Sequence, residues 1–370
     1  MSLRLRVLLM GLMSFALFFG FLHLFVSGRT LYNYERLHIF LFNLCSGGTI
    51  LIYYSEAQKE LSKKAALFLT LAITYAILAF LKLYLPALII AFVLAVIVDS
   101  VRIRKFSIFP GNLFNPRAPV YQKFHQASLL CLSIGLVISG LVILNNEYLK
   151  IISFPKLKLD TFFLGFSFPI SLITMSVMFS FMQDDFGRLV QGLKNVGFWN
   201  VNLGVIIFFL FIMFEQLVPQ LIVTTILFLS VVMIFYLFIK LAARMQQKNF
   251  LTSGMLFLLY TAITGIVYIA LEFSPDYTPE KTKLLLRMHS FASLYGWNLS
   301  GLAVICRQHD FPIQLNYKTI IAVHWFTAIL LAPLGTFYRP FAVSALLCYV
   351  FILYMILFSK GVGRAPCNTS

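Results

Sequence analysis

The chain has 370 residues, of which 60% are hydrophobic and only 11% are charged. A water-soluble domain of this size carries about a quarter charged residues, so the composition excludes that class. The formal net charge is +16, but the basic residues lie in short segments between long apolar runs. That distribution is typical of the loops of a membrane protein, and we expect no nucleic acid among the partners.

The first apolar run follows Arg4 and Arg6 and extends to Val26. It is about twice as long as the apolar region of a secretory signal peptide, and no small-residue cleavage site closes it. We therefore interpret it as a first membrane span that stays in the protein.

Apolar runs bounded by charged residues, Pro or Gly predict an all-α polytopic membrane protein with about twelve transmembrane helices. The longest connections, 102–124 and 273–286, are too short to form a soluble domain, so residues 1–370 are predicted to be a single integral membrane domain. The predicted spans are 6–27, 34–54, 65–84, 86–101, 125–145, 161–182, 197–216, 218–241, 250–272, 287–306, 318–337 and 341–360.

The loop charges predict the orientation of these spans. With the N-terminus inside, 19 of the 29 Lys and Arg residues fall on the inner side and the other 10 on the outer side. Because positively charged loops stay in the cytoplasm, we expect both termini to be cytoplasmic.

Two histidines then enter the membrane from the same side. His38 lies near the start of the second span, and His289 near the start of the tenth. At 1.5 Å per residue, both lie within ~6 Å of the outer ends of their helices. An imidazole in apolar surroundings is costly unless it is hydrogen-bonded or ligated, so two at one depth suggest a cofactor between the helices.

The motifs around these histidines resemble subunit I of the haem-copper oxidase superfamily, and more closely its C-type oxidases and nitric oxide reductases. Arg36-Leu37-His38 followed by Gly47-Gly48 is similar to that family's second span. His289-Ser290 followed by Gly296-Trp297 is similar to its tenth span.

The resemblance implies that His38 and His289 are the axial metal ligands of a low-spin haem near the outer face. It also implies that Arg36 and Arg339 bind the haem propionates. Haem b is the expected type, because no CxxCH motif is present for covalent attachment. The implied function is electron transfer or redox or gas sensing in a bacterial inner membrane. A quinol or a periplasmic cytochrome would be the donor, and other respiratory subunits would be partners.

The chain also departs from that family's pattern. Arg287 stands where the family has the histidine that binds the high-spin haem. The spans at 161–182 and 197–216 contain no histidine, whereas the family's copper ligands lie in these spans. Copper is therefore not expected, and neither is catalytic reduction of oxygen or nitric oxide.

Two other functions remain open. The chain could be a cofactor-free transporter or permease of twelve spans, or a membrane assembly protein in which the histidines are incidental. His38 and His289 could equally be interfacial side chains that hydrogen-bond to carbonyls or headgroups. Two more histidines, His125 and His324, lie toward the inner side, where they are interfacial residues or a second cofactor site.

Overall fold

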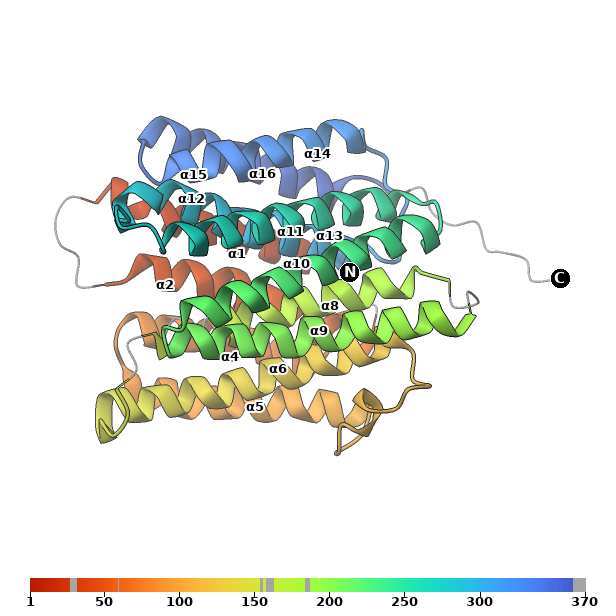
Figure 1. Cartoon of the computed structure of the whole chain (residues 1–370), viewed down its shortest axis with the longest axis horizontal. Coiled ribbons are helices and arrows are strands. Elements are labelled where there is room, and N and C mark those ends of the chain that lie inside the picture. Colours follow the sequence, from red (N-terminus) through yellow and green to blue (C-terminus); the bar gives the residue numbers. More distant parts are fainter. Residues whose placement is uncertain (27–31, 59, 154–155, 158–162, 184–186, 362–370) are drawn as a thin grey trace.

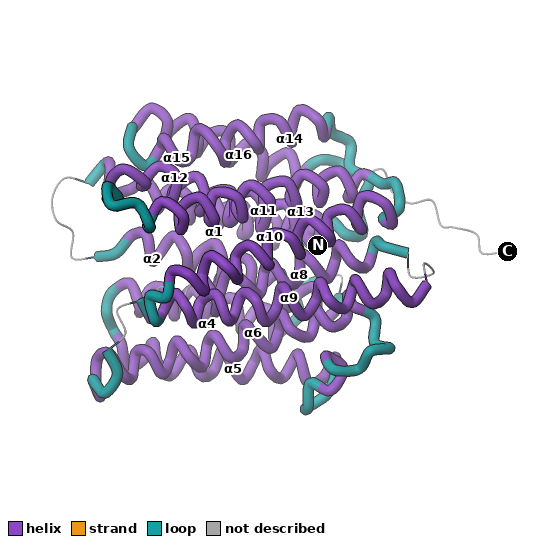
Figure 2. Tube along the Cα trace, viewed as in Figure 1, coloured by secondary structure: helices purple, strands orange, loops and turns teal. Residues whose placement is uncertain are grey.

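The computed structural model describes residues 1–26, 32–58, 60–153, 156–157, 163–183 and 187–361. In these ranges the chain forms twelve long helices and no β-strand (Figure 2), which confirms the predicted all-α polytopic fold. In chain order the helices are α1 with η1 (Leu3–Phe21, Leu22–Leu24), α2–η2–α3 (Tyr34–Ile39, Phe40–Gly48, Thr49–Glu56), α4 (Lys63–Phe80), α5 (Tyr84–Lys105), α6 with η4 (Val120–Ile143, Leu144–Leu149), η5 with α8 (Phe163–Ser167, Phe168–Ser180), α9 (Gly187–Met213), α10 (Leu217–Leu241), α11 (Gln246–Leu271), α12–η6–α13 (Pro279–Phe291, Ala292–Asn298, Leu299–Cys306), α14–η7–α15 (Tyr317–Trp325, Phe326–Leu331, Ala332–Gly335) and α16 (Arg339–Phe358).

Each predicted span corresponds to one of these helices, with two notable differences in where a helix begins. The tenth helix begins at Pro279, eight residues before the predicted 287–306, because Pro279 follows the N-cap residue Thr278 and Glu280 lies in the first turn. The seventh begins at Gly187 rather than at 197. Residues 27, 161 and 162 of the predicted spans 6–27 and 161–182 lie outside the described residues.

The helix ends have local causes. The side chains of Asn33, Ser62 and Asn316 each accept a hydrogen bond from a backbone N–H in the first turn of a span. Two connections of three residues, after α4 and after α9, turn through Lys82 and Glu215, which have φ of 61° and 55°. The left-handed backbone at these two residues reverses the chain within three residues.

The helices pack side by side in one bundle (Figure 1). The helices α14, α15 and α16 lie along one edge, α4, α5 and α6 lie along the opposite edge, and α1 and α2 lie between them. The guanidinium of Arg6 donates to the Leu357 carbonyl at 3.1 Å, so the start of α1 and the end of α16 lie at one end of the bundle. We call this end the terminal face, and the other end, where His23 meets the Thr336 carbonyl at 3.1 Å, the distal face.

Burial is uneven among the helices. In the most apolar 18-residue window of Tyr34–Glu56, 89% of the residues are buried, against 17% for α9 and 28% for α10. Within the described residues, eleven helices are long and apolar enough to cross a membrane. The remaining long helix, the tenth in chain order (Pro279–Cys306), is not among them, although its segment from Tyr295 to Cys306 is buried. The most polar long helix thus contributes a buried segment to the bundle.

Candidate functional site

The candidate site is built around Tyr295, in the π-helical segment η6 of the tenth helix. The tyrosine side chain is 2% exposed. Helical side chains lean toward the N-terminus of their helix, so the phenol of Tyr295 extends toward the distal face. There it meets His38, on the first turns of the second helix. Single-turn π segments recur at functional sites in proteins, and η6 places this tyrosine at the centre of a polar cluster.

His38 is held between two helices. Its Nδ1 lies 2.7 Å from the Ala16 carbonyl oxygen of α1 and 3.0 Å from the Tyr295 hydroxyl. Because a carbonyl oxygen only accepts, Nδ1 must carry the proton, and Nε2 then carries the lone pair. Gly20 makes this fit possible, since a Cβ there would lie 2.9 Å from Nδ1. The imidazole therefore has a fixed tautomer, and its Nε2 lies 3.5 Å from the Tyr295 hydroxyl.

Two further side chains complete the cluster. His324 of α14 donates from Nε2 to the Tyr295 carbonyl at 2.5 Å, and the ring of Tyr349 from α16 meets the Tyr295 ring edge-on, with centroids 5.1 Å apart. We call His38, Tyr295, His324 and Tyr349 the His–Tyr cluster. It joins four separate helices inside the bundle.

The same helices carry buried polar groups that, among the described residues, have no hydrogen-bond partner. They include the Tyr349 hydroxyl, the Trp297 indole nitrogen and the Asn43 side-chain oxygen. Each such group costs about 1–3 kcal/mol, and a buried polar atom of this kind calls for an explanation. Polar groups inside a membrane protein often line a path for an ion or substrate, which is one explanation for this cost.

The second predicted ligand, His289, faces a different helix. Its Nδ1 lies 2.9 Å from the Thr261 carbonyl of α11, and a Cβ on Gly265 of α11 would lie 3.1 Å from its Cε1. Phe291, two residues later, points the other way, because two residues turn an α-helix by about 200°. The Phe291 ring stacks on Phe21 of α1 at 6.0 Å and on Tyr295 at 5.6 Å.

This packing bears on the expected haem. Each histidine uses its Nδ1 for a backbone carbonyl, which is how ligating histidines are commonly oriented. The face of the tenth helix that meets α1 and His38, however, carries Phe291 and Tyr295 instead of His289. The two histidines therefore do not fit a haem clamped between them, and haem binding stays a prediction of the resemblance alone.

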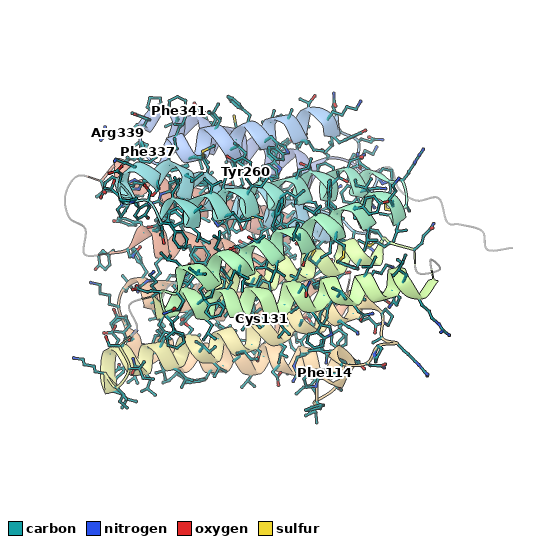
Figure 3. The ribbon with its side chains drawn as sticks, in the orientation of Figure 1. Phe114, Cys131, Tyr260, Phe337, Arg339 and Phe341 are labelled. Carbon is teal, nitrogen blue, oxygen red and sulfur yellow. The ribbon has the colours of Figure 1, made fainter. Side chains whose placement is uncertain are left out.

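The two predicted propionate ligands both lie at the distal face. Arg36 lines a pocket there, described below. Arg339 lies beside Phe337 and Phe341 at that end of the bundle (Figure 3); its Nε donates to the Leu24 carbonyl at 2.8 Å, and its guanidinium lies over the Phe25 ring. Arg339 is therefore engaged with the end of the first helix.

The inner histidines do not share a site. The Nε2 of His125 lies 2.7 Å from the Ser55 hydroxyl, and its ring stacks on Tyr54, whereas His324 belongs to the His–Tyr cluster. In the part of the chain that the structure describes, no group of three or more His, Cys, Asp and Glu residues could hold a metal ion.

The sequence alone did not single out Tyr295 as a functional residue. A tyrosine in a membrane span is more often a packing or interface residue. Its position six residues after His289, in the same predicted span, was the only available signal.

Comparisons with protein-family models, with curated proteins and with solved structures gave no match for this chain.

Proposed function

We propose that this protein is a membrane permease that conducts protons through the His–Tyr cluster. The observation that carries the proposal is the contact between His38 and Tyr295, two titratable side chains from different central helices, at 3.0 Å. Ionisable side chains inside membrane helices are costly and typically mark proton or substrate paths. A bacterial inner membrane with both termini inside is the setting that we propose.

Each member of the cluster has a distinct role in this proposal. The lone pair of His38 Nε2 accepts a proton that arrives from the distal face, and the Tyr295 hydroxyl exchanges protons with the imidazole. The Tyr349 hydroxyl is the next group; among the described residues it has no hydrogen-bond partner, so a proton would reach it from Tyr295 through an intervening water. His324 positions Tyr295, because it bonds to the backbone carbonyl and leaves the hydroxyl untouched.

The helix geometry supports a path at this place. The second and tenth helices carry π segments of nine and seven residues, η2 with the buried Asn43 and Ser46 and η6 with the buried Tyr295 and Asn298. Transporter sites near the middle of the membrane are often formed where a helix departs from regular α geometry. Such segments allow small local rearrangements without unfolding the span.

The test is proton flux into liposomes that contain the purified protein and an internal pH dye, under an imposed potassium diffusion potential. We expect the wild type to acidify the interior, and Tyr295→Phe to slow this by about tenfold, the effect of losing one hydrogen-bonding group worth about 1.4 kcal/mol. Tyr236→Phe is the matched control, because Tyr236 is 61% exposed on α10. A wild type no faster than empty liposomes, or an unaffected Tyr295→Phe, would contradict the proposal.

Electron transfer by a bound haem, with a quinol or a periplasmic cytochrome as donor, is the second candidate. The backbone hydrogen bonds of His38 and His289 favour it, because they orient each ring and leave Nε2 as the ligating nitrogen. The arrangement of the two rings on different sides of the tenth helix disfavours it. The variants His38→Ala and His289→Ala, measured singly and together, separate the two candidates.

A further inference from the structure

The distal face contains a pocket of ≈ 560 Å³ between α1, α2, α4 and α12. Its volume lies within the ~300–1,000 Å³ range of sites for small molecules. Gly20 lines the pocket, and the ring of His38 lies directly beneath that glycine. Gly20 thus contacts both the pocket and the His38 ring of the His–Tyr cluster.

The lining is strongly basic. It includes Arg36, Lys82, Lys283 and Arg287, together with His23, and its one carboxylate is Glu35. Glu35 is paired with Arg287, whose Nη1 lies 2.5 Å from Oε1. The other cations of the lining come from α2, α12 and the turn before α5, and the ammonium of Lys283 on α12 also lies 5.5 Å from the centroid of the Phe337 ring.

This clustering runs against the charge distribution of the chain as a whole. Cationic residues favour the inner side of a membrane protein, and only 10 of the 29 Lys and Arg residues fall on the predicted outer side. Four of those 10 line this pocket. Like charges brought together repel one another, so an arrangement of this kind is favourable when an anion neutralises it.

The rest of the wall suggests the size and nature of the ligand. Tyr32 stacks on Phe80 with centroids 5.0 Å apart, and Tyr34 packs against the same ring at 5.6 Å. These rings add apolar surface to the pocket lining beside its cations. An aromatic wall beside several cations suits a phosphorylated organic group better than a bare inorganic ion.

We propose that this distal pocket is a binding site for a phosphate-bearing anion, either a soluble one or the headgroup of an anionic lipid. Arg36 and Lys283 are the principal contacts, since they approach from different helices and both line the cavity. The inference does not rest on proton conduction and stands or falls separately from it.

The first test is calorimetric titration of the detergent-purified protein with sodium pyrophosphate as the probe. We expect saturable binding that weakens about tenfold in Lys283→Gln and further in the Arg36→Gln, Lys283→Gln double variant, because each change removes one charge-assisted contact. Lys281→Gln is the matched control: it is on the same helix and bonds to the Asp276 carbonyl, but it does not line the pocket. Lys283→Arg should restore binding and shows that the fold is intact.

The second test separates the two sources of the phosphate group. Reconstitution into nanodiscs of phosphatidylcholine should leave pyrophosphate binding intact, whereas nanodiscs with phosphatidylglycerol should abolish it if the lipid headgroup occupies the pocket. Equal weakening by Lys281→Gln and Lys283→Gln would reveal non-specific attraction and overturn the proposal. So would the absence of binding in both detergent and phosphatidylcholine nanodiscs.

Discussion

The tenth helix is polar and has a buried segment inside the bundle, whereas the helices α9 and α10 are apolar and mostly exposed. In the most apolar 18-residue window of each helix, only 17% of the residues are buried for α9 and 28% for α10. Trp297 and Asn298 of the tenth helix are both fully buried. Among the described residues, this is the one long helix that is not apolar enough to count as a candidate membrane span. Polarity in this bundle therefore increases toward the inside.

The difference teaches what drives packing in a bilayer. Lipid is as apolar as leucine, so an apolar side chain gains little by moving from lipid into the bundle. Polar groups gain a great deal, because lipid offers them no hydrogen bonds. Close approach between central helices then depends on small residues, whereas the peripheral pair only has to match the lipid.

The largest expected effect is a steric one that contrasts two glycines. A Cβ on Gly301 of α13 would lie 1.9 Å from the Thr174 side-chain oxygen of α8, whereas a Cβ on Gly192 of α9 would meet nothing within 4 Å. We expect Gly301→Ala to destabilise the protein by about 3 kcal/mol through overpacking, and Gly192→Ala to stabilise it by up to about 1 kcal/mol through helix propensity. Thermal unfolding in detergent measures both.

The prediction is contradicted if Gly301→Ala and Gly192→Ala unfold at the same temperature. That result would mean that α8 and α13 separate easily, and the central helices would then be no more tightly packed than the peripheral ones. Thr174→Ala combined with Gly301→Ala is the internal check, because the smaller side chain should relieve part of the loss.

Length and composition were sufficient to predict the fold. Apolar runs about 20 residues long and their punctuation predict the twelve long helices, eleven of which are, within the described residues, long and apolar enough to cross a membrane. The direction in which each histidine points could not be predicted in the same way. One residue rotates a helix by about 100°, so the depth of His289 in the membrane says nothing about which neighbour it faces.

A stability comparison with an expected effect of intermediate size tests whether His38 and His289 act as a pair. The geometry predicts independence, because their rings contact α1 and α11 on different sides of the tenth helix. We expect the stability losses of His38→Ala and His289→Ala to add within about 0.5 kcal/mol in the double variant, as for sites that share no partner. His38→Ala should cost more, since its ring is buried and that of His289 is partly exposed.

A reduced-minus-oxidised absorption spectrum of the same proteins gives the second readout. A sharp low-spin haem band that disappears in both single variants, with strong non-additivity in stability, would show that the tenth helix turns His289 toward His38. The haem function would then replace proton conduction. Independent variants without such a band are the expected outcome.

The smallest expected effect on stability concerns the partly exposed ion pair between Arg287 and Glu35 in the lining of the distal pocket. The side chains of Arg287 and Glu35 are 30% and 59% exposed, and such a pair contributes about 0–1 kcal/mol. Glu35→Gln should therefore leave the unfolding temperature almost unchanged. It should nevertheless strengthen pyrophosphate binding about threefold or more, because it removes the one carboxylate of the lining and releases Arg287 to contact the anion.

Glu280→Gln is the matched control for this variant, since Glu280 lies in the first turn of the same helix as Arg287 and outside the pocket lining. Titration of both variants at two salt concentrations measures the effect. An equal gain in affinity from the two substitutions would mean that overall charge, and not the pocket, attracts the anion. A gain in affinity confined to Glu35→Gln, with an unchanged unfolding temperature, would instead show that the pocket lining contributes to anion binding and little to stability. The closely packed central helices would differ in this respect, because they contribute mainly to stability.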